Sequence, residues 1–386
     1  MIPYGRQFID EADIEAVVAV LRSDFITQGP AIARFEESVA QFCGARHAVA
    51  LANATAALHI GALALGLEPG DRLWTSPNTF VASANCGLYC GARVDFVDID
   101  SRTYNMSATC LDAKLEAAAA NGTLPKVLVP VHFSGQPCEM EAIGALAAKY
   151  GVRVMEDASH AIGAEYRGEK VGGRHADLTI FSFHPVKVLT TGEGGMLLTN
   201  DSTLYEKLIR LRSHGITRDA RFLEGPADGP WAYQQVDLGF NYRMTDIQAA
   251  LGASQMTKLA AFLERRRELA ARYDRLLADQ PLILPWQHPD TLSAWHLYVV
   301  RPDPGRTAIT RAELYAGLRE RGVAPQVHYI PVHTQPYYQK LGFEAGDFPM
   351  AEAYYNDALS LPMFYSLSDS EQDCVVTALK EILTHE

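Results

Sequence analysis

The chain has 386 residues, of which 48% are hydrophobic and 21% are charged, a composition typical of a globular protein with one large core or two domains. Its formal net charge of −12 argues against a protein that binds nucleic acid or an anionic membrane surface. From Met1 onward the chain has no charged-then-apolar leader and no apolar run long enough to cross a bilayer, so we expect a cytoplasmic protein.

The first part of the chain alternates helical patterns with short β-prone runs. Apolar residues follow Asp10 at helical spacing, and a second helical pattern over residues 54–67 ends in the glycine turn 66–70. The β-prone runs are residues 47–51, 92–99, 125–133, 151–157 and 177–183. This alternation predicts a parallel, doubly wound α/β sheet.

After Met244 the pattern changes to a long helical stretch, residues 245–279, with no strand inside it. A β-prone run, a helix, a second β-prone run and a terminal helix follow, which is typical of a smaller α+β domain. We therefore predict a large α/β domain over residues 1–250 and a small C-terminal domain over residues 251–386.

The six cysteines predict neither a disulfide framework nor a metal site. They are scattered through a chain that is too large to need disulfides for its stability. Cys86 and Cys90 would share one face of a helix, but no CxxC pair or histidine cluster completes a set of metal ligands. We expect Cys86 and Cys90 to be thiols of the core, and we expect no metal site.

Residues at the predicted strand ends have the chemistry of a binding site. Ligands of open α/β sheets bind at the carboxyl ends of the strands. One strand ends at Asp157, and the next delivers Ser182 and then Lys187. The turn at residues 53–55 offers backbone N–H groups and a hydroxyl that can hold a phosphate. An acid, a lysine and a phosphate cradle would then face one crevice.

These three parts suit pyridoxal phosphate (PLP). The cofactor needs an amine that forms an imine, a carboxylate that keeps its pyridine nitrogen protonated, and an anion site. No GxxxxGK[ST] loop and no GxGxxG sequence after a first strand occurs, which argues against nucleotide triphosphate or NAD chemistry. The glycines of "TTGEGG", residues 190–195, instead allow a tight return from the lysine loop into a strand.

Ordered segments along essentially the whole chain resemble the DegT/DnrJ/EryC1/StrS family of PLP-dependent sugar aminotransferases. The resemblance implies the fold type I, aspartate aminotransferase-like α/β architecture, PLP that becomes pyridoxamine phosphate during turnover, and a homodimer with shared active sites. The segments are "ITQGP", "NATAALH", "TFVASAN", "EDASHA", "FSFHPVK", "TTGEGG", "RSHGI" and "GFNYRMTDIQAALG".

The resemblance also implies a role for individual residues. Lys187 would carry PLP covalently and then move protons between cofactor and substrate carbons, and Asp157 would pair with the pyridinium nitrogen. His160, where many members have Gln, would lie near the phenolic oxygen of the cofactor, and Phe80 would stack on its ring. The implied phosphate ligands are Ala54, Thr55, Ser182 and, from the neighbouring subunit, Asn241.

A branch of this family carries a histidine in place of the lysine and performs dehydration instead of amination. In this chain Lys187 fills the lysine position, and His184 is an additional residue of the same loop. The sequence therefore favours transamination.

Finer features resemble the aminotransferases of the pseudaminic acid pathway. The segments are "FSFHPVK", "RSHGITR" and "PQVHYIPVHTQPYYQKLG". They imply transfer of the amino group of glutamate to C4 of UDP-2-acetamido-2,6-dideoxy-β-L-arabino-hexos-4-ulose. The implied contacts to this substrate are Tyr4, Ile26, Thr27, Gln28, Gly29, Ala54, Ser182, Asn241, His328 and Tyr329.

Other functions stay open at this point. Relatives that aminate UDP-4-ketopentose for lipid A modification usually have Ala-Ile before the lysine, whereas Pro185 and Val186 stand here. An amino acid aminotransferase would need an arginine for the substrate carboxylate, and Arg301 is available for that role. A non-catalytic protein of this fold is disfavoured by the intact Lys187 and Asp157.

Overall fold

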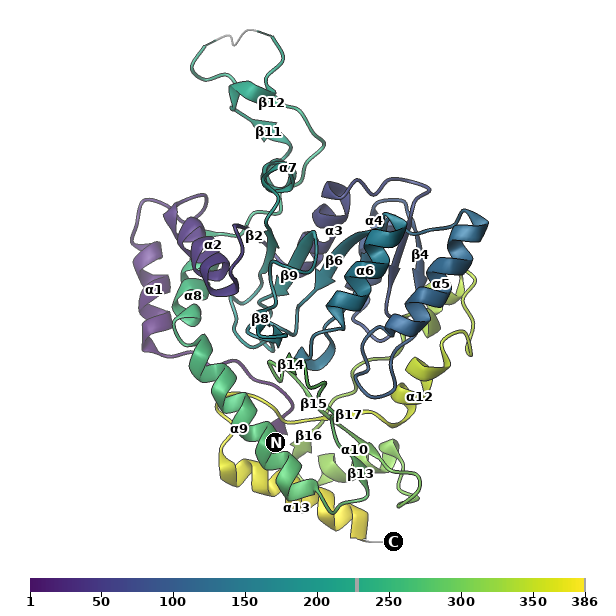
Figure 1. The fold of residues 1–386 in the computed structure, drawn as a ribbon. Helices are drawn as coiled ribbons and strands as arrows, with labels where there is room; N and C mark the ends of the chain where they lie inside the picture. The colour runs from purple at the N-terminus through teal and green to yellow at the C-terminus, as the bar shows by residue number, and fades with distance from the viewer. Residues whose placement is uncertain (226–228, 385–386) are drawn as a thin grey trace.

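The structure, a computed structural model, describes residues 1–225 and 229–384 and is built on a seven-stranded sheet (Figure 1). The predicted parallel sheet is confirmed except at β10, which is antiparallel to both of its neighbours, while the other neighbouring pairs are parallel. In spatial order the strands are β2 (His47–Leu51), β10 (Gly195–Thr199), β9 (Leu178–Ser182), β6 (Arg153–Asp157), β5 (Val127–Val129), β3 (Arg72–Thr75) and β4 (Arg93–Phe96).

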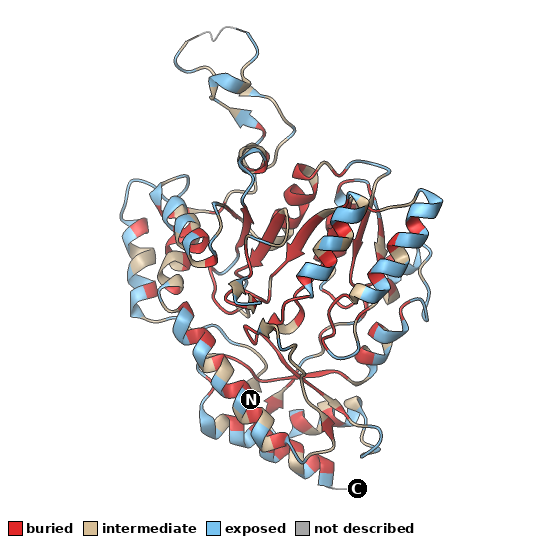
Figure 2. Cartoon of the chain, viewed as in Figure 1, coloured by how far each residue is buried: buried red, intermediate tan, exposed pale blue. Residues whose placement is uncertain are grey.

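Helices cover both faces of this sheet, and all residues of β9 and β10 are buried for that reason (Figure 2). Alternate strand side chains enter different hydrophobic clusters, as the period of two along a strand requires. One face packs against α3 (Ala54–Ala64), α4 (Ala82–Tyr89) and α7 (Ser202–Arg212). The other packs against α2 (Pro30–Cys43), α5 (Ala108–Asn121), α6 (Met140–Tyr150) and α8 (Asp246–Met256).

The C-terminal part contains a small antiparallel sheet with helices packed on it. The predicted helical stretch 245–279 divides at Thr257 and Lys258 into α8 and α9. The domain division at residue 250 stays a prediction, and α8 runs across it; residues 385–386 of the predicted small domain lie outside the described residues. The elements are α9 (Leu259–Leu277), β13 (Leu282–Ile283), β15 (Tyr298–Pro302), α10 (Arg311–Glu320), β17 (Leu359–Leu361) and α13 (Asp369–Thr384).

Short elements complete the fold. Parallel pairing of β1 with β16 attaches the N-terminal residues to the C-terminal part of the chain. The strands are β1 (Ile2–Pro3), β7 (Glu165–Tyr166), β8 (Glu169–Lys170), β11 (Ile216–Thr217), β12 (Gln234–Gln235), β14 (Thr291–Leu292) and β16 (Val323–Ala324). The helices are α1 (Glu11–Leu21), α11 (Pro336–Gln339), α12 (Pro349–Asp357) and the 3₁₀ turns Phe133–Gly135, Ala220–Phe222 and Val332–Thr334.

All six cysteines are free thiols, and Cys86 and Cys90 are buried, as predicted. Within residues 1–225 and 229–384, no group of three His, Cys, Asp or Glu side chains is arranged to hold a metal ion. In the same part of the chain, no helix combines the length and the apolarity that a membrane span needs.

A buried arginine connects α9 to the segments beside it. Arg266 is 2% exposed, and its Nη1 donates to the carbonyl oxygens of Trp295 (3.1 Å), His296 (3.3 Å) and Met363 (3.0 Å). These carbonyl groups are buried together with Arg266. If the arginine side chain were removed, water could not replace it as their hydrogen-bond donor. Arg266 therefore fixes the segment that enters β15 against α9.

We expect Arg266→Met to lower the free energy of unfolding by about 2 kcal/mol, because three buried carbonyl groups lose their donor. The midpoint of urea unfolding, followed by circular dichroism, measures the change. Arg275→Met, an exposed position on the same helix, is the control and should shift stability by less than about 0.5 kcal/mol. Equal midpoints for the two variants would contradict the role assigned to Arg266.

Candidate active site

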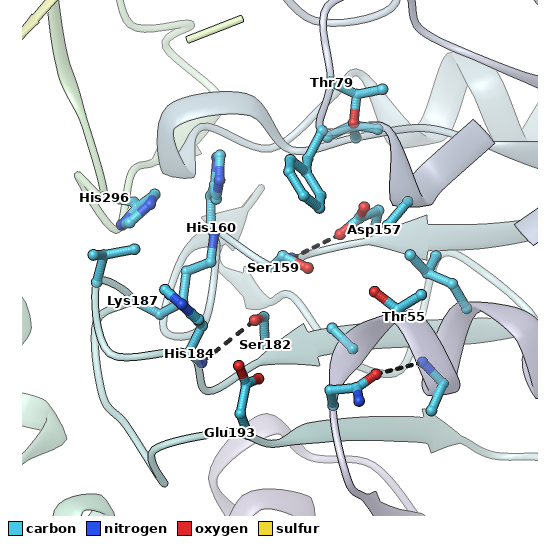
Figure 3. A pocket seen from close by; sticks show the side chains of 18 of the residues that line it. Thr55, Thr79, Asp157, Ser159, His160, Ser182, His184, Lys187, Glu193 and His296 are labelled. Carbon is cyan, nitrogen blue, oxygen red and sulfur yellow. Dashed lines mark hydrogen bonds between the residues drawn. The ribbon is translucent and has the colours of Figure 1, made fainter. Parts of the chain in front are cut away.

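One cavity of about 880 Å³ lies at the carboxyl ends of β6 and β9, beside the N-terminus of α3 (Figure 3). Its position is the one expected for a ligand site in an open α/β sheet. Most of the side chains that the sequence analysis selected border this single cavity. They are Tyr4, Ala54, Thr55, Phe80, Asp157, His160, Ser182, Lys187, His328 and Tyr329.

Lys187 lies in the loop that joins β9 to β10, where its backbone N–H donates to the carbonyl oxygen of His184 (2.9 Å). Burial lowers the pKa of the Lys187 ammonium to about 8, and the negative charge of Asp157 opposes this shift. A larger share of this amine is therefore neutral near physiological pH than for an ordinary lysine, and a neutral amine is the nucleophilic form.

Asp157 is the last residue of β6 and is 5% exposed. Its Oδ2 accepts a hydrogen bond from the Ser83 hydroxyl (2.6 Å), and its Oδ1 accepts from the backbone N–H of Ser159 (3.1 Å). Two donors therefore hold both oxygens of the carboxylate in place at the carboxyl end of β6.

The start of α3 forms a cradle for an anion. Asn53 caps this helix with its side-chain oxygen, and helix geometry leaves the first-turn amides of Ala54 and Thr55 without intrahelical acceptors. Thr55 and Ser182 also border the cavity. A Cβ on Gly195 would lie 2.5 Å from the backbone carbon of Asn53, so β10 passes directly against this turn.

His160 is held in one neutral tautomer. Its Nδ1 accepts from the backbone N–H of Ser134 (3.3 Å), so its proton lies on Nε2, which is 3.2 Å from the Tyr329 hydroxyl. Burial and the positive charge of Lys187 keep the pKa of His160 well below its usual value. Nε2 of His160 can therefore donate a hydrogen bond but cannot accept one. Its contact with the phenolic oxygen of the cofactor stays a prediction.

Other histidines border the cavity as well, among them His296 and His328. His296 is 3% exposed, its ring centroid lies 4.3 Å from that of His160, and its Nδ1 has no hydrogen-bond partner in the described part of the chain. Burial keeps the pKa of His296 well below the ordinary value, and it lowers the pKa of His328 to about 3. These imidazoles are therefore neutral at physiological pH.

The N-terminus and the C-terminal part together supply one wall of the cavity. Tyr4 follows β1, which pairs with β16, and its ring centroid lies 5.2 Å from that of His328. Phe80 is 59% exposed, and its ring centroid is 6.3 Å from that of Tyr329. An aromatic side chain that borders the cavity without being buried in the core is available to stack on a planar ligand.

Two predicted segments do not reach this cavity within one chain. Residues Ile26–Gly29 lead into α2, where Asp246 accepts hydrogen bonds from backbone N–H groups. Part of this segment borders a separate hollow together with Arg212 and Arg243. Asn241 is exposed and forms an isolated bridge elsewhere. The ligand contacts predicted for these residues stay predictions, and the contact predicted for Asn241 concerns the cofactor of a neighbouring subunit.

Sequence reasoning missed several residues of the site. Thr79 borders the cavity, and Ser83 in the first turn of α4 contacts Asp157, but neither stood out in "TFVASAN" because only packing brings them to Asp157. Glu193 stands inside the glycine-rich loop and also borders the cavity. His296 had no signal of its own, because only the packing of the β15 segment brings it to this place.

The residues present fit PLP. An amine at Lys187, a carboxylate at Asp157 and the cradle at the start of α3 face one cavity from three directions (Figure 3). When bound there, the cofactor supplies a carbonyl that takes up amino groups and a ring that delocalises the electron pair left by proton removal.

Comparison with known proteins gives consistent matches over the whole chain. The model of the DegT/DnrJ/EryC1/StrS aminotransferase family matches residues 7–380. The spore coat polysaccharide biosynthesis protein SpsC of Bacillus subtilis is 42% identical over 385 residues, which cover 99% of this chain and 97% of that protein.

Solved structures agree with the sequence matches. PseC of Helicobacter pylori, an aminotransferase involved in the biosynthesis of pseudoaminic acid, superposes with a TM-score of 0.89 at 31% identity and covers 99% of both chains. The PLP form of the putative sugar aminotransferase Spr1654 of Streptococcus pneumoniae gives a TM-score of 0.88 at 29% identity, over 99% of this chain and 100% of that chain. A form of Spr1654 with pyridoxamine phosphate gives 0.89.

We expect Lys187 to react as a neutral amine at lower pH than a surface lysine. In cofactor-free protein its reductive methylation rate should rise about tenfold per pH unit below pH 8 and level off above it, since its pKa is lowered to about 8. Peptide mass spectrometry across a pH series measures the rate. Exposed Lys149, whose pKa is raised by Tyr150, is the internal control and should react only at higher pH. A Lys187 rate that kept climbing with that of Lys149 would rule out the shift.

Proposed function

This chain belongs to the DegT/DnrJ/EryC1/StrS aminotransferase family and is a PLP-dependent sugar aminotransferase, and we propose that it aminates C4 of UDP-2-acetamido-2,6-dideoxy-β-L-arabino-hexos-4-ulose with glutamate as donor. The arrangement of Lys187, Asp157 and the α3 cradle around one cavity carries the chemical part of this proposal. The acceptor sugar is the part that requires an experiment.

Each group of the chain has a distinct task in the proposed reaction. Lys187 would hold the cofactor covalently until the amine of the donor displaces it, and the freed Nζ would then take the proton from the α-carbon of the donor and later deliver a proton to the sugar carbon. The Asp157 carboxylate pairs with the ring nitrogen and keeps it protonated. The amides of Ala54 and Thr55 and the Ser182 hydroxyl bind the phosphate group.

The side chains around the remaining space suit a sugar. Histidine and tyrosine groups that are neutral at physiological pH offer hydrogen bonds to hydroxyl and carbonyl oxygens without the desolvation cost of a charge. Similarity to PseC over the full length supports the pseudaminic acid assignment, whereas SpsC, the match at higher identity, is named for spore coat polysaccharide biosynthesis. Both names concern sugar metabolism.

Arg301 does not support the alternative of an amino acid aminotransferase. Its side chain is 17% exposed, and its Nη2 lies 3.4 Å from Oδ2 of Asp357. Its guanidinium carbon also lies 5.8 Å from the ring centroid of Tyr104. Arg301 is therefore paired inside the C-terminal part, and it does not border the cavity where a substrate carboxylate would bind.

A homodimer with shared sites is part of the proposal. No arginine borders the cavity in residues 1–225 and 229–384, although a donor with carboxylates and a nucleotide diphosphate both need cationic partners. Near Asn241, the β11–β12 arm projects from the body (Figure 1) and exposes Trp231 (69%), Tyr233 (57%) and Leu238 (81%). A two-stranded arm with exposed apolar side chains needs a covering surface, and a second copy of this chain would provide it.

We expect the purified protein to aminate the proposed 4-keto-6-deoxy sugar faster than its C5 epimer by at least about tenfold, because a misplaced methyl group costs about 1–3 kcal/mol in a shaped pocket. The panel contains both epimers and UDP-4-ketopentose, each with glutamate. Mass spectrometry detects replacement of the carbonyl oxygen by an amine. Lys187→Ala is the control and should give no product. Faster turnover of UDP-4-ketopentose would assign the protein to lipid A modification instead.

The shared site predicts complementation between two inactive variants. When equal amounts of Lys187→Ala and Asn241→Ala chains exchange subunits, half of the dimers are mixed, and one site in each mixed dimer regains both native residues. We expect about a quarter of wild-type activity in the mixture and almost none in either parent. Activity that stays at the parental level after exchange, or a fully active monomer in light scattering, would contradict the shared site.

A further inference from the structure

Two buried hydroxyl groups form a chain to Asp157, those of Ser83 and of Thr79, and Thr79 also borders the cavity. Ser83 Oγ lies 2.6 Å from Oδ2 of Asp157 and 2.8 Å from Oγ1 of Thr79. Ser83 is fully buried and Thr79 is 2% exposed. Ser83 lies in the first turn of α4 and Thr79 lies in the segment before this helix, whereas Asp157 comes from β6, so tertiary packing joins them.

The direction of these hydrogen bonds follows from the chemistry of the groups. An ionised carboxylate only accepts, so Ser83 must donate its proton to Asp157. The hydroxyl of Ser83 then has only its lone pairs left, so Thr79 must donate to Ser83. The chain therefore runs from Thr79 through Ser83 to Asp157 and polarises each donor toward the carboxylate.

We infer that Ser83, supported by Thr79, is a positioning residue that keeps Asp157 as a carboxylate aimed at the ring nitrogen of the cofactor. This inference rests on the proposed pairing of Asp157 with that nitrogen. A carboxylate that accepts a charge-assisted hydrogen bond from Ser83 is a weaker competitor for the proton it shares with the pyridine ring. The proton therefore stays on the ring, where it makes the ring an electron sink.

Removal of the Ser83 hydroxyl changes how the proton is shared between the ring nitrogen and Asp157. Without the Ser83 donor, Oδ2 of Asp157 becomes more basic, and the shared proton moves from the ring nitrogen toward the carboxylate. The ring then delocalises negative charge less well, and removal of the donor α-proton by Lys187 slows. Donor binding changes little, because Ser83 does not contact the substrate.

The test uses holoenzyme reconstituted with PLP that carries ¹⁵N in its ring. We expect the ring nitrogen of wild type to show the chemical shift of a protonated pyridine, and that of Ser83→Ala to move toward the unprotonated value. We further expect kcat to fall about tenfold to hundredfold, the effect of one hydrogen bond to a charged group, with KM for glutamate within about twofold. The kinetic isotope effect of α-deuterated glutamate should increase, because proton removal becomes more rate-limiting.

Matched variants separate this role from a general loss of packing. Thr79→Val should move the chemical shift of the ring nitrogen in the same direction as Ser83→Ala does, and it should lower kcat by a smaller factor. Thr75 on β3 carries an equally buried hydroxyl, which donates to the carbonyl oxygen of Val129 (2.8 Å). Thr75→Val removes this hydroxyl and should change neither the chemical shift of the ring nitrogen nor kcat. If Ser83→Ala fails to fold, Thr79→Val carries the test.

The outcomes distinguish the inference from the proposed role of Asp157. Asp157→Asn should give an unprotonated ring nitrogen and the largest loss of kcat. A normal ring nitrogen in Asp157→Asn would remove the pairing on which the inference rests. A strong effect of Asp157→Asn together with a wild-type nitrogen shift and kcat in both Ser83→Ala and Thr79→Val would overturn the inference alone.

Discussion

The parallel pairing of β6 with β9 is the constraint on which the site depends. Asp157 lies opposite Ile180 in this register, so β9 continues for two more residues to Ser182 before the chain turns into the loop with Lys187. Side chains alternate along a strand, and a slip of one residue would exchange Asp157 for Glu156. Glu156 faces the opposite side of the sheet, where it accepts a hydrogen bond from Thr179 (2.7 Å).

The reversed strand β10 completes the arrangement. Because β10 returns between β9 and β2, it brings Gly195 against the backbone of Asn53 and Ala54 and sets the distance between the lysine loop and the start of α3. A side chain at position 195 would push this turn away. The phosphate cradle and the lysine are therefore placed by the same two strands.

Burial controls the electrostatics of the cavity. It lowers the pKa of Lys187 to about 8 and keeps His160 and His296 neutral, so few of the groups around the ligand carry charge. Asp157 contributes a carboxylate, and Ser83 and the N–H of Ser159 hold both of its oxygens. Such a site contains a nucleophilic amine near neutral pH, and the Asp157 carboxylate is available for a strong electrostatic interaction with the cofactor ring.

The periodicity of the sequence was sufficient to predict the strands of the main sheet other than β3, and it also predicted the crevice with Asp157, Ser182 and Lys187, because the carboxyl ends of neighbouring parallel strands lie side by side. Resemblance to a family added Tyr4, His328 and Tyr329, and pairing of β1 with β16 explains how Tyr4 reaches the others. Neither approach found Ser83 beside Asp157.

Only the tertiary structure shows how the residues of the site are protonated, oriented and hydrogen-bonded. The direction of the chain from Thr79 to Asp157, the neutral tautomer of His160 and the arrival of His296 depend on which buried groups face one another across elements distant in sequence. Local spacing carries no information about such partners, because hydrogen bonds and burial are properties of the packed interior. The sequence by itself therefore determined the chemistry that is available, and packing decided the protonation and orientation in which it is used.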